Sequence, residues 1–275
     1  MRVSESGYRA WSQWKPSRRE QSNQTLMERM RSLFDRSGET YGSRRITDDL
    51  HEAGECVNRK RVARLMSAAG LKACSPRRFT VTTDSEHTLP VAENRLDREF
   101  TCLTPNAKWT ADITYIWTSE GWLYLAVVLD MFSRRVVGWA TGATLERSLV
   151  IAALEQAERT RKPPSGLLCH RDRGSQYASH DYQKRLQDAG IVCSMSRKGN
   201  CWDNAPTESF FATLKKELVH RIRFATRGAA HPAVFAWIEV WYNRHRKHST
   251  LGYLSPEAFE RKYRTEQQTM KMALA

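Results

Sequence analysis

The chain has 275 residues, with 44 Lys and Arg against 30 Asp and Glu, which gives a formal net charge of +14. This length predicts one main domain and a smaller one, and the positive charge favours a polyanionic partner. Six cysteines without a CxxC pair argue against zinc fingers and disulfide scaffolds, and the apolar run at 122–129 is too short to cross a bilayer. We therefore expect a cytoplasmic protein.

The basic charge is concentrated outside the middle of the chain. Residues 1–80 carry 17 basic and 9 acidic side chains, and residues 215–264 carry 11 and 4. Residues 108–214 carry 13 and 11, so they are almost neutral. Cationic flanks around a neutral segment are typical of an enzyme that binds DNA outside its reaction centre. A basic protein with merely solvated charges would have the same composition.

The N-terminal part of the chain has a helical pattern. We assign residues 1–25 to an N-terminal arm, and apolar residues between 26 and 71 recur at helical spacing in three short groups. A helix, a Gly-containing turn and a second helix form the layout of a helix-turn-helix, which we place at residues 26–75. Residues 58–69 would be its recognition helix, with Arg59, Lys60 and Arg61 in the first turn, where side chains reach the DNA groove. Helical proteins that never bind DNA have the same periodicity.

The rest of the chain predicts an α/β fold. Residues 76–107 read as a linker, because they keep no sustained period. Strand patterns follow at 109–117, 122–129, 135–140, 166–170 and 191–195, and helical patterns at 145–159, 179–189 and from 207 onward. Three antiparallel strands and then helices alternating with single strands describe a mixed five-stranded sheet flanked by helices. We place this core at 108–220, a basic and aromatic helical part at 221–264, and a tail at 265–275.

Three carboxylates in different local contexts are the candidate site. Asp112 lies midway along the first predicted strand, Asp172 just beyond the fourth, and Glu208 in the first turn of a late helix. Ligands of open α/β sheets gather at the carboxyl ends of strands. Mg²⁺ and Mn²⁺ bind several carboxylate oxygens at once. Without a bound cation, the three carboxylates would repel one another. We expect two divalent cations per site and phosphoryl transfer on nucleic acid.

Other residues compete with these roles or support them. We assign Asp130 to a turn or an ion pair, and Asp203 to capping or bracing the helix that follows it. Lys215 lies seven residues after Glu208, which is two helical turns, so its charge would hold the DNA backbone beside the metal site. In the C-terminal part we assign phosphate contact to the cationic residues and core packing to Trp237 and Trp241. Those cationic residues are Arg244, Arg246 and Lys247.

Several ordered motifs carry a family resemblance. The stretches HRDRGSQYAS, SRKGNCWDNAPTESFFATLKKEL and WYNRHRKHSTLGYLSPEAF resemble the second-reading-frame product of bacterial insertion-sequence transposases with a retroviral-integrase-like core. The resemblance extends from about Arg2 to Tyr263. It implies a ribonuclease H-like fold, a helix-turn-helix ahead of the core, and an Asp-Asp-Glu triad on Asp112, Asp172 and Glu208, with Lys215 as the basic residue after the Glu.

The resemblance also implies partners. One active site would cut the ends of the element and join the freed 3′-hydroxyl to target DNA, acting as a homo-oligomer on DNA in the nucleoid. An upstream reading-frame product of the same element would bind its ends. Two departures from the family pattern stand out: Arg171, where many relatives have Ser, and the Gly and Pro residues at 226–232, which put the start of a helix in doubt.

Two other functions stay open. A non-catalytic DNA-binding regulator would use the helix-turn-helix alone, and divalent metal would then be irrelevant. A nuclease or junction resolvase on the same fold would cut DNA without joining it.

Overall fold

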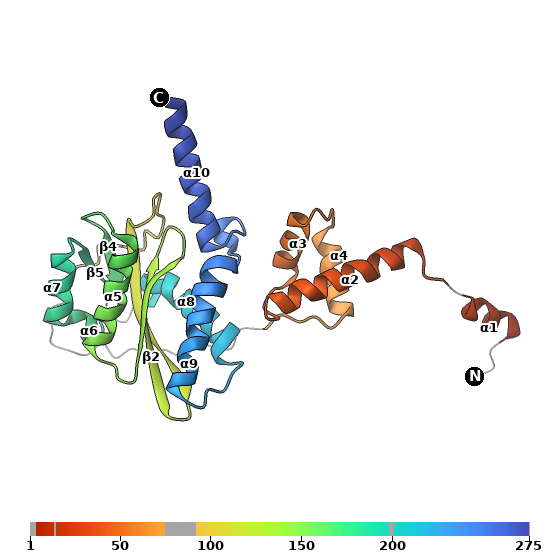
Figure 1. The fold of residues 1–275 in the computed structure, drawn as a ribbon, viewed down its shortest axis with the longest axis horizontal. Coiled ribbons are helices and arrows are strands. Elements are labelled where there is room, and N and C mark those ends of the chain that lie inside the picture. Colours follow the sequence, from red (N-terminus) through yellow and green to blue (C-terminus); the bar gives the residue numbers. More distant parts are fainter. Residues whose placement is uncertain (1–3, 14, 75–91, 198–200, 275) are drawn as a thin grey trace. The chain divides into compact units, whose positions relative to one another are not determined.

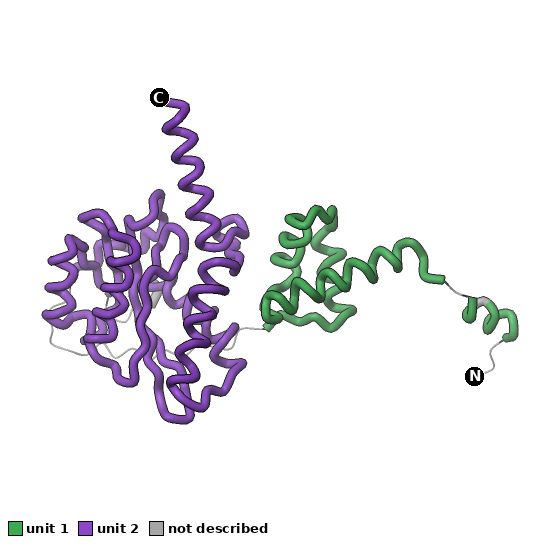
Figure 2. The backbone as a smooth tube through the Cα atoms, viewed as in Figure 1, with its two compact units in different colours: residues 1–74 green, residues 75–275 purple. Residues whose placement is uncertain are grey.

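The structure is a computed structural model that describes residues 4–13, 15–74, 92–197 and 201–274. The chain divides into two compact units, residues 1–74 and residues 75–275 (Figure 2). Each unit has its own set of buried apolar side chains, so each is a separate fold.

Unit 1 is helical (Figure 1). Its elements are α1 (Glu5–Ser12), α2 (Arg18–Arg36), α3 (Ser43–Glu52) and α4 (Arg59–Ala68). The last three bury the apolar residues of the helical pattern, namely Leu26, Met30, Phe34, Ile46, Leu50, Val62, Leu65 and Met66. The three predicted helices are therefore confirmed.

Capping residues decide where these helices begin. α2 begins at Arg18, inside the segment assigned as an arm, because Ser17 and Glu20 form a capping box. The Ser17 hydroxyl accepts from the N–H of Glu20 at 3.2 Å, and the Glu20 carboxylate accepts from the N–H of Ser17 at 2.7 Å. Asn58 caps α4 in the same way, by accepting from the N–H of Lys60 at 2.7 Å.

Unit 2 contains the predicted mixed sheet of five strands. They are β1 (Lys108–Thr118), β2 (Gly121–Asp130), β3 (Val136–Gly142), β4 (Leu168–Arg171) and β5 (Val192–Met195), in the sheet order β3-β2-β1-β4-β5. β1 pairs antiparallel with β2, and β2 with β3. β4 pairs in parallel with both β1 and β5. The three long strands thus form a meander, and the two short ones are added by helical crossovers.

Helices cover both faces of the sheet (Figure 1). α5 (Arg147–Arg161), α6 (Ser175–Ala178) and α7 (His180–Asp188) share a buried cluster with Trp109 and Ala111 of β1. On the other face lie α8 (Ala205–Leu214), α9 (Arg227–Phe235) and the π-helical segments η2 (Lys215–Val219) and η3 (Ala236–His245). Trp237 is buried in this second cluster and Trp241 packs against it, which confirms both as core contacts.

The structure differs from the sequence prediction at three boundaries. Residues 92–107 of the predicted linker are part of unit 2. Leu96 is buried there, and its N–H donates to the Ser194 hydroxyl of β5 at 3.2 Å. Residues 76–91 of the predicted linker lie outside the described residues. α9 begins at Arg227 despite Gly and Pro nearby, because Thr226 caps it. α10 (Pro256–Leu274) continues through the predicted tail, whose Glu, Gln, Lys, Met and Ala side chains favour helix.

Candidate active site

The register between β1 and β4 brings Asp112 and Asp172 to one place. Ala111 of β1 is paired in parallel with Arg171, the last residue of β4. Asp112 and Asp172 directly follow this pair of residues in the sequence, so both carboxylates lie at the carboxyl end of β4. This is the sheet edge at which α/β folds collect ligands.

Asp112 is held by two hydrogen bonds. Its Oδ1 accepts from the backbone N–H of Ile113 at 2.7 Å, and its Oδ2 accepts from the side-chain amide of Asn204 at 3.1 Å. The side chain is half-buried. Asn204 is the last residue of the 3₁₀ turn η1 (Cys201–Asn204), directly before α8. The amide therefore connects the first strand to the helix that carries Glu208.

Asn204 is itself fixed by a buried hydroxyl pair. Its Oδ1 accepts from Thr110 of β1 and, at 3.0 Å, from Thr207 of α8. Thr110 and Thr207 are fully buried, and Asn204 is 4% exposed. Thr110 is two residues before Asp112 and so faces the same side of β1. The sequence analysis missed Asn204; the available signal was an Asn preceding Ala-Pro at a helix start, which suggests a cap, yet this side chain caps nothing and turns to β1.

Asp172 and Glu208 approach from other elements. Asp172 follows β4, and its Oδ1 accepts from the N–H of Gly174 at 3.0 Å, which folds the loop back on the carboxylate. Glu208 lies in the first turn of α8. Both side chains are half-buried, and burial raises the pKa of the Glu208 carboxyl.

The three carboxylates share one electrostatic field. Burial, and then the charges of Asp172 and Glu208, raise the pKa of Asp112 well above its usual value. Lys215 acts on Asp112 in the opposite direction. The three predicted carboxylates are therefore close enough to act on one another, and their negative charges repel.

The triad is spread rather than closed around a point. Among the described residues, the group of three acids with ligand atoms within 4.8 Å of one another is Asp48, Asp49 and Glu52 on α3, not the triad. Neighbouring acids on a helix surface are common without any ion. The ligand atoms of the triad therefore do not all lie within 4.8 Å of one another.

Lys215 lies beside this site. It follows α8 as the first residue of η2, and its Nζ lies 5.3 Å from the centroid of the Tyr115 ring on β1. Burial lowers the pKa of Lys215, and the charge of Asp112 opposes that shift. The predicted two-turn spacing thus puts a cation next to the carboxylates.

The competing acids are buried and form ion pairs. Asp130 ends β2, accepts from the N–H of Phe132 at 2.9 Å and pairs with Arg161 at 3.1 Å, as a turn and an ion pair predict. Asp203 pairs with Arg98 at 2.9 Å and with Arg197 at 3.1 Å. Hydrogen bonds from Arg197 hold the pKa of Asp203 below its usual range despite burial. Asp203 therefore braces the segment before β1 and the loop after β5 instead of capping α8.

Arg171 points away from the carboxylates. Successive side chains of a strand face opposite sides of the sheet, so Arg171 enters the core on the α5 side. It is fully buried, its Nη2 donates to Cys193 Sγ at 2.6 Å, and its guanidinium lies 4.6 Å from the centroid of the Tyr182 ring. The Arg171 side chain thus packs in the core and faces away from the carboxylates of the triad.

The predicted basic residues of α4 separate into two kinds. Arg59 and Lys60 are exposed. Arg61 is half-buried and donates from Nη2 to the Ser22 hydroxyl at 2.9 Å and to Asn23 Oδ1 at 2.8 Å, both on α2. Arg61 therefore ties two helices together.

The C-terminal basic residues need one correction. Arg244 is exposed and lies 3.7 Å from Glu257. Arg246 is buried, and its Nη2 forms an ion pair with Glu217 of η2 at 2.9 Å. Lys247 is buried as well. The predicted phosphate contact of Arg246 is not supported, because its guanidinium is committed to a carboxylate inside the unit.

Family models match most of the chain. An HTH-like domain matches residues 21–79, and two integrase core domain models match residues 103–201 and 189–256. The latter two together span the whole sheet and the helices as far as η3. The fold of this part is ribonuclease H-like.

Curated relatives decide the family. The IS600 31 kDa protein of Shigella sonnei is 46% identical over 261 residues, covering 95% of this chain and 96% of that protein. The transposase InsF for insertion sequence IS3A of Escherichia coli K12 is 44% identical over 264 residues, covering 95% and 92%. The chain belongs to the family of insertion-sequence transposases. Its Asp112, Asp172 and Glu208 thus lie in a transposase core.

Solved structures resemble this transposase more distantly. A simian T-cell lymphotropic virus intasome in complex with PP2A regulatory subunit B56 gamma is 18% identical, with a TM-score of 0.48 over 83% of this chain and 73% of that one. The HTLV-2 integrase catalytic core domain in complex with magnesium is 20% identical, with a TM-score of 0.43 over 56% and 95%. No described helix of the transposase is long and apolar enough to span a membrane.

The correction at Arg246 leads to a stability prediction. Replacing Arg246 by Met leaves the Glu217 carboxylate buried without its partner, which we expect to cost about 3–5 kcal/mol of unfolding free energy. The matched change of Arg244 to Met, in an exposed pair, should cost about 0–1 kcal/mol. Urea denaturation followed by tryptophan fluorescence measures both. An Arg246→Met protein with unchanged stability and weakened DNA binding would return Arg246 to the DNA-contacting residues.

Proposed function

We propose that this chain is the catalytic subunit of a DNA transposase, which cuts the ends of an insertion element and joins them to target DNA with divalent metal. The observation that carries the proposal is the convergence of Asp112, Asp172 and Glu208 at one edge of the sheet, where burial and then the charges of Asp172 and Glu208 raise the pKa of Asp112. A protein that only bound DNA would not need three mutually repelling carboxylates at one site. Membership of the transposase family agrees with this reading.

The donor set fits hard divalent cations. Carboxylate oxygens are the ligands that Mg²⁺ and Mn²⁺ prefer, and a cation would reverse the repulsion among three half-buried acids. Asp112, Asp172 and Glu208 would hold two such ions. When bound, the ions would stabilise the charge on the attacking and leaving oxygens of an in-line displacement at phosphorus.

The other residues of the site would hold the substrate and the ligands. Lys215 would place its ammonium against the DNA phosphate next to the reacting one, since its charge already lies beside Asp112. Asn204 would keep Asp112 in one rotamer through its amide. In cleavage, a water oxygen would attack phosphorus and the bond to the element's 3′ oxygen would break. In joining, that freed 3′-hydroxyl would attack a target phosphodiester and release its 3′ oxygen.

The remaining partners follow from the same proposal. Element ends and target DNA would both be substrates, and copies of the chain would act together as a homo-oligomer on DNA. An upstream reading-frame product of the same element would contribute to binding its ends. Three of the basic residues that the sequence predicts to contact DNA are exposed, and we retain them as DNA contacts. They are Arg59 and Lys60 of α4 and Arg244 of η3.

Neutral isosteres of the triad test the chemistry. Asp112→Asn, Asp172→Asn and Glu208→Gln should each lower cleavage and joining at least about a thousandfold, because each removes a charged metal ligand while keeping the shape. The assay incubates the protein and its upstream partner with labelled element-end DNA and Mg²⁺ or Mn²⁺. DNA affinity in EDTA should stay within about twofold, and Asp188→Asn, an exposed acid on α7, is the control.

Other outcomes would select other functions. Cutting without joining would favour a nuclease or resolvase. Metal-independent binding with neither cutting nor joining, in the wild-type protein with its upstream partner, would favour a regulator.

The hydrogen bond from Asn204 to Asp112 leads to a separate prediction. Asn204→Ala should lower activity about 10- to 100-fold and raise the Mg²⁺ concentration needed for half-maximal rate, because a released Asp112 binds metal less well. Gln156→Ala removes a comparable hydrogen bond, from the N–H of Trp139 to Gln156 Oε1 of α5 at 2.6 Å, on the α5 side of the sheet. It should leave the Mg²⁺ dependence unchanged. Equal metal dependence in both variants would show that Asn204 has only a structural role.

A further inference from the structure

Unit 1 contains an open pocket between α2 and α4 with a strongly basic lining. Its volume is about 500 Å³, which is within the range of about 300–1,000 Å³ typical of ligand pockets. The lining consists of Arg19 and Ser22 from α2, and Lys60, Arg61 and Arg64 from α4. No acidic side chain lines it. Four cations and one hydroxyl around a cavity are the chemistry of an anion site.

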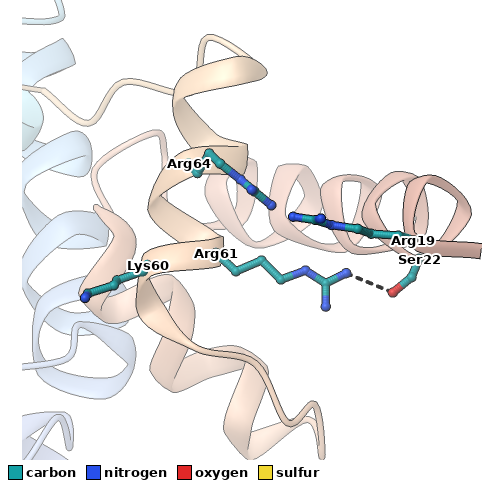
Figure 3. Close-up of a pocket in the computed structure, with 5 residues that line it drawn as sticks. All are labelled: Arg19, Ser22, Lys60, Arg61 and Arg64. Atoms are coloured by element: carbon teal, nitrogen blue, oxygen red, sulfur yellow. Dashed lines mark hydrogen bonds between the residues drawn. The ribbon is translucent and has the colours of Figure 1, made fainter.

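The two exposed arginines converge across the pocket. Figure 3 shows the guanidinium ends of Arg19 and Arg64 directed toward one another from the two helices, while Lys60 points away from them. Within the part of the chain that the structure describes, neither arginine has an ion-pair partner. Two like charges that face each other repel, and an anion between them would turn that cost into attraction.

Neighbouring groups do not neutralise the pocket. Glu20 follows Arg19, but its carboxylate accepts from the N–H of Ser17 in the capping box. Arg61 uses its Nη2 on Ser22 and Asn23, so it fixes the distance between the helices and adds positive charge to the floor. Arg19 lies in the first turn of α2, where the helix dipole also favours an anion.

We propose that this pocket holds a phosphate of the duplex DNA backbone, gripped by Arg19 and Arg64, with Arg61 as a positioning residue. The proposal rests on the proposed function, which supplies DNA as the ligand. It adds to the expectation from the sequence, in which the DNA contacts of unit 1 are Arg59, Lys60 and Arg61 of α4. Arginine forks suit phosphate oxygens because they can donate two parallel hydrogen bonds. A backbone contact carries no base information, so it would position unit 1 on any sequence.

The test is the salt dependence of DNA affinity for the full chain. Wild type, Arg19→Gln/Arg64→Gln and Arg31→Gln/Arg36→Gln are titrated into two labelled 30-base-pair duplexes of unrelated sequence, in EDTA, between 50 and 200 mM NaCl. The second double variant removes the same charge from exposed positions of α2 outside the pocket. Loss of the contact with this phosphate should reduce the slope of log affinity against log salt by about 1 and weaken binding about tenfold or more on both duplexes.

Three results would overturn the proposal. A pocket variant that matches the control variant in slope and affinity would show that the pocket does not contact a DNA phosphate. A loss confined to one duplex would indicate base readout instead of backbone contact. Displacement of DNA by millimolar inorganic phosphate, at constant ionic strength and in wild type alone, would assign the pocket to free phosphate.

Failure here can be distinguished from failure of the proposed function. The titrations contain no divalent metal, so they report binding whether or not the triad performs chemistry. The triad variants should keep the wild-type salt slope while they lose cleavage and joining. A thermal melt of each arginine variant checks that unit 1 remains folded.

Discussion

The parallel pairing of β1 with β4 is the constraint on which the candidate site depends. It aligns Ala111 with Arg171, and the two residues that follow are both aspartates. A shift of one residue in either strand would turn one carboxylate to the opposite face. The core on the α5 side, with Trp109, Cys169 and the buried Arg171, makes such a shift costly. Packing on one face thus fixes the charge geometry on the other.

A second set of contacts joins this edge to α8. Asn204 is bonded to Thr110 and Asp112 of β1 and to Thr207 of α8, so the helix that carries Glu208 is tied to the strand that carries Asp112. Asp203, next along the chain, binds Arg98 and Arg197. These two residues of η1 therefore connect β1, α8, the segment before β1 and the loop after β5. This framework holds the three carboxylates together despite their mutual repulsion, and bound cations would relieve that repulsion.

The sequence predicted the elements, and the carboxylates that they bring together, better than the direction of other side chains. Strand and helix patterns depend on local periodicity, and the triad depends on strand ends and a helix start, so both could be inferred without coordinates. Whether Arg246 faces solvent depends on Glu217, 29 residues earlier in the chain, which no local pattern reveals. The direction of the Arg171 side chain depends on the strand register. The role of Asn204 depends on the contact between β1 and α8, which lie far apart in the sequence. The length of α2 was readable from Ser17 and Glu20, but the capping box was overlooked.

The most direct measurement is the location of bound metal in crystals of the wild-type protein soaked in Mn²⁺, by anomalous scattering. We expect two peaks about 3.5–4 Å apart, within ligand distance of Asp112, Asp172 and Glu208, when DNA is present. Peaks only at other acids, such as those on α3, or none near the triad at millimolar Mn²⁺, would contradict the account.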